Sequence, residues 1–287
     1  MFDGNPIDGR TQPPPPGVGR YSLATAIALG SVLSQYVVPG AVPAVAPLYH
    51  DLVSALLLVY GLPILAFALL VGGAPISHGL DRLSAGGIEG LRWYGVFSLL
   101  AFLVSLVLLI ALEGLDPSAL DRLNAPNPAL EAARSNPWFW IGFSFAIGAL
   151  EETIFRGWVF GYWVARGSPR WLGHALWTSA AFAGVHLYYG TTYGVASLAI
   201  FPMLFLVGLG YAVAFRYSGG SLVAIALLHG AFDATSFLTL VSAPLAAALK
   251  FGVILAGLAI AAVVYRRHRR IVRPPQTPEG GGPPAPP

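Results

Sequence analysis

The fold is decided by one long apolar stretch that carries charges, residues 138–164, which read WFWIGFSFAIGALEETIFRGWVFGYWV. The charged side chains in this stretch are Glu151, Glu152 and Arg156. An apolar helix of this length is typical of a membrane span, and a charge at the centre of a bilayer costs roughly 3 to more than 10 kcal/mol. Such residues are therefore rare and usually functional. Two adjacent carboxylates and an arginine are hard to explain by packing alone, so their role depends on which other polar side chains can meet them.

The composition of the chain is that of a membrane protein. Of its 287 residues, 56% are hydrophobic and 10% are charged, whereas a soluble domain has about 25% charged residues. The net charge is only +3, and the basic residues lie mainly in loops and a tail. This pattern suits a lipid bilayer as partner and argues against nucleic acid. The chain has no cysteine, so disulfides, thiolate catalysis and Cys-ligated metals are excluded.

Eight segments are apolar and long enough to cross a bilayer as helices. Their approximate bounds are 21–39, 52–71, 91–112, 137–165, 171–189, 193–217, 221–240 and 246–265. The predicted fold class is therefore all-α, a polytopic transmembrane helix bundle of about eight spans. If the N-terminus lies inside, only Arg122 and Arg134 among the loop and tail arginines fall outside. The positive-inside rule thus predicts that both termini lie inside.

The predicted membrane domain is residues 21–265, with a tail at each end. Residues 1–20 contain consecutive prolines and no apolar core of a signal peptide, so we expect a disordered tail. Residues 266–287 begin with a basic run, expected to touch anionic headgroups, and continue as a Pro- and Gly-rich tail. We predict an integral, multi-pass protein; the excess of arginine over lysine favours a bacterial inner or plasma membrane.

The fourth segment holds the first motif, Glu151-Glu152-x-x-x-Arg156. Glu152 and Arg156 are four residues apart and share a helix face, where they can form an ion pair. Glu151 lies about 100° around the helix from Glu152 and is left for another role. The functional interpretation makes Glu151 a general base and the Glu152–Arg156 pair its scaffold. The structural alternative is an ion pair that only clamps two helices.

The fifth and seventh segments each supply a histidine motif. Phe182 precedes His186 by one turn, so its ring can pack on the imidazole, and Gly184 allows a neighbouring helix to come close. The alternative for His186 is an interfacial or interhelical histidine. His229 and Asp233 are four residues apart, a spacing that suits two metal ligands or a histidine oriented by a carboxylate. Their alternative is a hydrogen bond between helices.

Together, the three motifs hold the groups needed to hydrolyse a peptide bond inside a membrane. A carboxylate can activate water, His and carboxylate ligands can bind Zn²⁺ and so acidify bound water, and a further polar group can stabilise an oxyanion. Other hydrolase signatures, H-E-x-x-H and G-x-S-x-G, are absent from the sequence. The predicted catalytic residues are Glu151, Glu152, Arg156, His186, His229 and Asp233.

These motifs, in this order on successive membrane helices, resemble those of the CPBP family. That family comprises the CAAX prenyl endopeptidases and the bacteriocin-processing or Abi-type intramembrane proteases. The motif match covers residues 151–233, and the helix count extends the resemblance to most of residues 21–265. The resemblance implies an intramembrane endopeptidase that cleaves a membrane-associated protein or peptide.

The resemblance also implies a role for each motif. Glu151 resembles the catalytic glutamate, with the remaining charged pair of its motif as support. His186 resembles its partner in activating water. His229 and Asp233 occupy the place of oxyanion stabilisation or metal binding.

Enzymes of this family are described either as metal-free glutamate proteases or as zinc metalloproteases. Asp233 bears on which description fits this sequence. Asn is a frequent alternative at this position, and an ionised aspartate cannot donate a hydrogen bond to an oxyanion. Asp233 is then protonated, bound to a metal, or used to orient His229. We favour bound Zn²⁺, with His186, His229 and Asp233 as ligands; the metal-free enzyme is the alternative.

Two other function classes fit the same polar residues. A proton-coupled transporter also buries carboxylates and histidines, but it would more often show internal repeats, and here the polar residues cluster in one half of the chain. A non-catalytic scaffold or immunity protein on the same fold has no need of an intact catalytic set. Gly157-x-x-x-Gly161 could pack helices within one chain or between two, so it leaves the oligomeric state open.

Overall fold

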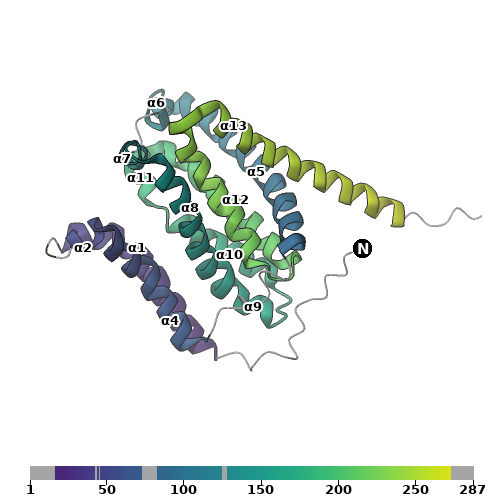
Figure 1. The fold of residues 1–287 in the computed structure, drawn as a ribbon, viewed down its shortest axis with the longest axis horizontal. Helices are drawn as coiled ribbons and strands as arrows, with labels where there is room; N and C mark the ends of the chain where they lie inside the picture. Colours follow the sequence, from purple (N-terminus) through teal and green to yellow (C-terminus); the bar gives the residue numbers. More distant parts are fainter. Residues whose placement is uncertain (1–16, 43, 45, 73–82, 125–127, 273–287) are drawn as a thin grey trace, which may run out of the picture.

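The computed structural model describes residues 17–42, 44, 46–72, 83–124 and 128–272, and the regular elements within them are all helices (Figure 1). The all-α fold class is confirmed for this part of the chain. The elements are α1 (Val18–Ala41), α2 (Ala46–His50), α3 (Leu52–Leu56), η3 (Leu57–Gly61), α4 (Leu62–Leu70), α5 (Leu83–Leu115), α6 (Ala119–Asn124), α7 (Pro128–Ala133), α8 (Pro137–Glu152), η5 (Thr153–Phe160), α9 (Gly161–Ala165), α10 (Trp171–Gly184), α11 (Tyr188–Tyr193), η6 (Gly194–Ala196), α12 (Ser197–Tyr217) and α13 (Leu222–Val272). Of these, η3 and η5 are π-helices and η6 is a 3₁₀ turn.

Within the described residues, five helices are long and apolar enough to cross a membrane. They are Val18–Pro39, Leu52–Leu70, Gly86–Leu115, Gly194–Tyr217 and Leu222–Arg267. The last one holds two predicted spans, because the chain bends at Ser242, whose φ of −158° and ψ of 102° are not helical, and Pro244 follows. This pattern is that of an integral, multi-pass membrane protein. The total of eight spans and the inside position of both termini stay predictions.

The other two predicted spans differ from a single long α-helix. Residues 137–165 are continuously helical, but η5 interrupts the α-helical geometry between α8 and α9. In the segment 171–189, α10 ends at Gly184 after 14 residues, about 21 Å, which is short of a ~30 Å hydrocarbon core. The prediction of one helix as far as residue 189 is therefore wrong at its C-terminal end.

The helical region extends slightly beyond the predicted domain. The helix α1 begins at Val18, so residues 18–20 are helical, and α13 continues to Val272 through the basic run predicted to lie in the C-terminal tail. The disorder predicted for residues 1–16, and the tail predicted for 273–287, lie outside the described residues.

Pro63 accounts for the π-helix η3. Proline has no N–H, so the carbonyl four residues earlier loses its α-helical partner. The segment just before this proline, Leu57–Gly61, adopts π geometry, and the N–H of Leu62 bonds the carbonyl of Leu57 five residues back.

The molecule has two parts that meet at η5. An N-terminal hairpin, made of α1 and the broken helix α3–η3–α4, lies at one edge (Figure 1, purple). The main bundle consists of α5, α8, α10, α12 and α13, which pack against one another. The hairpin meets η5 through Phe67, which stacks on Trp158 with ring centroids 5.2 Å apart, and through the Tyr21 hydroxyl, which donates to the Val159 carbonyl at 2.9 Å.

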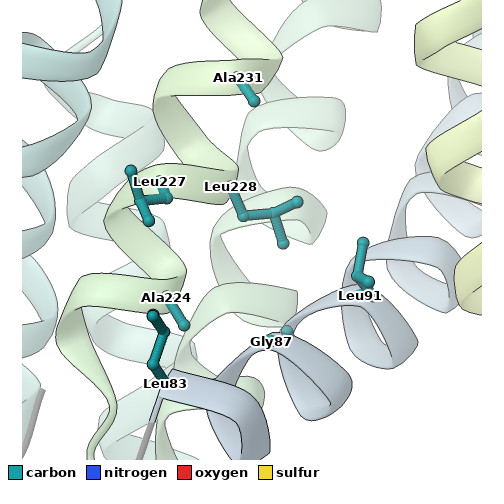
Figure 2. A pocket seen from close by; sticks show the side chains of 8 residues that line it. Leu83, Gly87, Leu91, Ala224, Leu227, Leu228 and Ala231 are labelled. Carbon is teal, nitrogen blue, oxygen red and sulfur yellow. The ribbon is translucent and has the colours of Figure 1, made fainter. Parts of the chain in front are cut away.

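An apolar groove of about 350 Å³ lies between the start of α5 and the first half of α13 (Figure 2). Leu83 and Leu91 of α5 line it together with Leu227 and Leu228 of α13. None of the six predicted catalytic residues lines this groove, so it is separate from the candidate active site.

Candidate active site

Two helices cross at glycines, and this crossing brings the His229-x-x-x-Asp233 motif close to the Glu151-Glu152-x-x-x-Arg156 motif. Gly148 of α8 meets Gly230 of α13 so closely that a Cβ added at Gly148 would lie 2.7 Å from the Gly230 nitrogen. No side chain fits at that distance, so glycine at both positions lets the two backbones touch. Glu151 and Glu152 follow Gly148 by about one turn, and His229 directly precedes Gly230. The crossing therefore holds the histidine beside the carboxylates. By contrast, the close approach predicted at Gly184 is not seen, since a Cβ there would meet nothing within 4 Å.

The ion pair predicted between Glu152 and Arg156 is present and fully buried. Arg156 Nη1 donates to Glu152 Oε1 at 2.9 Å, and Nη2 donates to the Gly208 carbonyl at 2.8 Å. The guanidinium carbon lies 4.7 Å from the centre of the Phe182 ring. Because a Cβ on Gly208 would lie 3.0 Å from Nη2, that glycine leaves room for the guanidinium. The arginine thus ties η5 to both α12 and α10.

His229 is the side chain that faces all three carboxylates. Its Nδ1 lies 2.8 Å from Glu152 Oε1, and an ionised carboxylate only accepts, so Nδ1 carries the hydrogen of this bond. Its Nε2 lies 3.7 Å from Glu151 Oε2 and 3.5 Å from Asp233 Oδ2. The Tyr211 ring stacks on the imidazole with centroids 5.2 Å apart. The bond at Nδ1 and the stacked ring fix the orientation of the imidazole.

Glu151 uses its two oxygens differently. Oε1 accepts a hydrogen bond of 2.9 Å from the Tyr60 hydroxyl. Oε2 faces His229 Nε2 at 3.7 Å, which is too long for a hydrogen bond. The side chain of Glu151 is 12% exposed and that of Glu152 is 0% exposed. Of the two adjacent glutamates, only Glu151 keeps an accessible surface.

His186 lies beyond the end of α10, in the turn that leads to α11. Its Nδ1 is 2.7 Å from the Phe182 carbonyl oxygen. Since a carbonyl only accepts, Nδ1 donates, and Nε2 is the basic nitrogen of the neutral ring. The Phe182 ring lies 4.9 Å from the His186 ring, which confirms their predicted packing, and 5.7 Å from the His229 ring. One phenylalanine therefore contacts both histidines.

Asp233 points at His229 with a side chain that is 32% exposed. The sequence predicted that it binds Zn²⁺ together with His186 and His229. Within the part of the chain that the structure describes, no group of three or more His, Cys, Asp or Glu residues is arranged to hold a metal ion. The zinc ligands are therefore not preformed here, and zinc binding stays a prediction.

Two tyrosines belong to the site that sequence reasoning missed. Tyr60 bonds Glu151, and Tyr211 stacks on His229. Tyr60 stands in an apolar segment, where a hydroxyl needs a partner, and that was the available signal for it. The predicted site consists of charged groups and histidines, so it does not include either tyrosine.

Carboxylates, histidines and an arginine that meet on packed membrane helices, with Glu151 and Asp233 partly exposed, are the features of a membrane-embedded hydrolytic site. Residues 133–235 match the family model described as type II CAAX prenyl endopeptidase Rce1-like. The match includes all three motifs and supports the resemblance of this part of the chain to the CPBP and CAAX protease family. It supports, in general terms, an intramembrane endopeptidase of the CAAX type. The comparison with curated proteins gave no match, and the comparison with solved structures gave none.

Proposed function

We propose that this protein is an intramembrane endopeptidase in which Glu151 activates the attacking water. The difference between the two adjacent glutamates carries the proposal. Glu152 is fully buried and shares one oxygen between Arg156 and His229, whereas Glu151 is accessible. A general base must reach the water that it deprotonates, so Glu151 suits the base and Glu152 the support.

In the proposed reaction, Glu151 takes a proton from water while the water oxygen bonds to the scissile carbonyl carbon. The electrons of the carbonyl double bond move to its oxygen, which becomes an oxyanion. When this intermediate collapses, the carbon–nitrogen bond breaks and the proton held by Glu151 passes to the leaving nitrogen. One carboxylate thus serves as base in the first step and acid in the second.

His229 is the proposed oxyanion donor. Three carboxylates face its ring and Arg156 supplies one compensating charge, so a cationic imidazole lowers the net negative charge of a buried cluster. The cation carries Nε2–H, a charge-assisted donor suited to an oxyanion. Asp233 then acts by orienting this cation, which is a role an aspartate can fill without donating a hydrogen bond.

His186 is proposed to orient the water. Its ring is held by the Phe182 carbonyl and by the Phe182 ring, which also contacts His229. No step of the proposal uses the zinc ion predicted from the sequence, because its ligand group is not preformed among the described residues.

A cleavage assay with two peptides tests the proposed base. One probe is a farnesylated peptide ending in a CAAX sequence, chosen from the description of the family, and the other is the same peptide without the lipid. We expect wild-type protein in lipid nanodiscs to cut at least one probe, and Glu151→Gln to lower the rate about 100- to 10,000-fold. Mass spectrometry of the products gives the measurement.

The matched control is Glu131→Gln, which changes an exposed glutamate of α7 and should leave the rate unchanged. Full activity of Glu151→Gln contradicts the assignment of the base. Binding of both probes without cleavage by wild-type protein favours the non-catalytic scaffold instead. Proton uptake driven by a solute gradient, without cleavage, favours the transporter.

Metal analysis separates the two forms of the mechanism. In the metal-free form, activity survives dialysis against a strong chelator and purified protein holds far less than one zinc per chain. In the zinc form, activity disappears with the metal and returns when Zn²⁺ is restored. One zinc ion per chain, on which activity depends, therefore overturns the metal-free form. The role of Glu151 would then have to be defined relative to that zinc ion.

A further inference from the structure

The N-terminal hairpin contributes a hydrogen bond to the candidate site. The Tyr60 hydroxyl donates to Glu151 Oε1 at 2.9 Å, and the two residues are 91 positions apart in the chain. Tyr60 lies outside the segment that matches the family model, residues 133–235. The contact therefore joins a part of the chain without any motif to the group proposed as general base.

The geometry gives this hydroxyl a definite effect on Glu151. The terminal torsion of a glutamate is broad, so a carboxylate with no fixed donor can turn. With Oε1 held by Tyr60 at a normal hydrogen-bond length, Oε2 stays directed toward His229 Nε2, 3.7 Å away. A base that is already oriented needs no reorganisation when the water attacks.

The local fold is built to present this tyrosine. Tyr60 lies in η3, the π segment that precedes Pro63. In the same segment, the Leu58 carbonyl accepts a hydrogen bond from the Ser31 hydroxyl of α1. Glu151 lies just before the second π segment, η5. Both helices that meet at the hydrogen bond thus depart from α geometry beside it, as π segments at functional sites often do.

We propose that Tyr60 is a positioning residue, whose hydroxyl holds the Glu151 carboxylate in the orientation that activates water. The inference rests on the proposed function, because it assumes that Glu151 is the base. It assigns the hairpin a part in the chemistry: the base is held in its working orientation by a side chain that the hairpin carries.

The test compares two tyrosines of the same hairpin. Tyr60→Phe keeps the ring and removes the hydroxyl, so we expect kcat to fall about 10- to 100-fold, the range that one hydrogen bond to a charged group is worth. The KM should stay within about twofold, because substrate contacts are unchanged. Tyr21→Phe removes a hydroxyl that bonds the Val159 carbonyl of η5, away from Glu151, and kcat should stay within about twofold.

A second variant separates the hydroxyl from the ring. Tyr60→Met lacks both, so its kcat should match that of Tyr60→Phe if the hydroxyl is what matters. The inference is overturned if Tyr60→Phe keeps the wild-type kcat while Glu151→Gln is inactive, or if only Tyr60→Met is impaired. If Glu151→Gln itself stays active, the proposed function fails first, and the two failures are thereby distinguished.

Discussion

The main bundle and the N-terminal hairpin both reach the Glu151–Arg156 motif, but they hold it in different ways. On the bundle side, Glu152 Oε1 is shared by Arg156 and His229, and all three side chains are buried. On the hairpin side, the Tyr60 hydroxyl contacts Glu151, and η5 is held through aromatic packing and a hydrogen bond to a backbone carbonyl.

Because of this difference, we expect the bundle contacts to affect mainly stability and the Tyr60–Glu151 contact to affect mainly the catalytic rate. The bundle buries charges that only remain stable as a network, so changes there should first lower the stability of the protein. The hairpin presents neutral donors, and the removal of one takes no charge out of the buried network. Loss of the Tyr60 hydroxyl should therefore act on the catalytic rate with a small effect on stability.

The largest expected effect is the loss of the buried arginine. Arg156→Met removes the cation of the buried Glu152–Arg156 pair and leaves Glu152 with His229 as its partner. Removal of one partner of a buried pair costs about 3–5 kcal/mol. Reversible unfolding in mixed detergent micelles measures the change. The control is Arg134→Met, which breaks an Arg–Glu pair whose side chains are 65% and 47% exposed and should cost less than about 1 kcal/mol. If both variants lose the same free energy of unfolding, burial does not explain the importance of the Glu152–Arg156 pair.

The second effect concerns the crossing that aligns His229 with the glutamates. Gly148→Ala places a methyl group 2.7 Å from the Gly230 nitrogen, so α8 and α13 must separate. Overpacking of this kind costs about 1–3 kcal/mol, and activity should fall as well because His229 moves with α13. Gly142→Ala, in the same helix, meets nothing within 4 Å and should leave stability equal or higher by about 0.4–1 kcal/mol. If Gly142→Ala loses as much stability as Gly148→Ala, the loss cannot be assigned to the close contact between α8 and α13.

The bundle side was largely predictable from the sequence, and the reasons are local. A spacing of four on a helix makes the Glu152–Arg156 pair and the Phe182–His186 packing almost obligatory. The sequence also indicated that the polar groups of the three motifs act together, since ionisable side chains within a membrane pair with one another, but it did not single out the contact between His229 and Glu152.

Other features were out of reach because hydropathy and charge do not encode them. The apolar run continues past Gly184, so nothing in its composition marks the end of α10 there. A glycine in an apolar helix does not by itself mark a close helix contact. Gly184 was expected to meet a neighbouring helix and does not, whereas Gly148 does. Tyr60 is placed by a π segment, whose extra residue per turn is a backbone property that no side-chain pattern reports.

The smallest expected effect is on the hairpin itself. The Tyr21 hydroxyl donates to the Val159 carbonyl at 2.9 Å and accepts from Trp163 Nε1 at 3.1 Å. Tyr21→Phe removes both bonds between neutral groups, so stability should fall by about 0.5–1.5 kcal/mol for each bond, measured by the same unfolding. The ring stays stacked on Tyr162, with centroids 4.0 Å apart in the wild type, so the hairpin should remain docked. A loss as large as that of Arg156→Met would mean that the hairpin, too, is held by a polar network, and the separation of folding from chemistry would fail. A small loss with unchanged kcat, beside a reduced kcat in Tyr60→Phe, would show that two hydroxyls of one hairpin serve different ends.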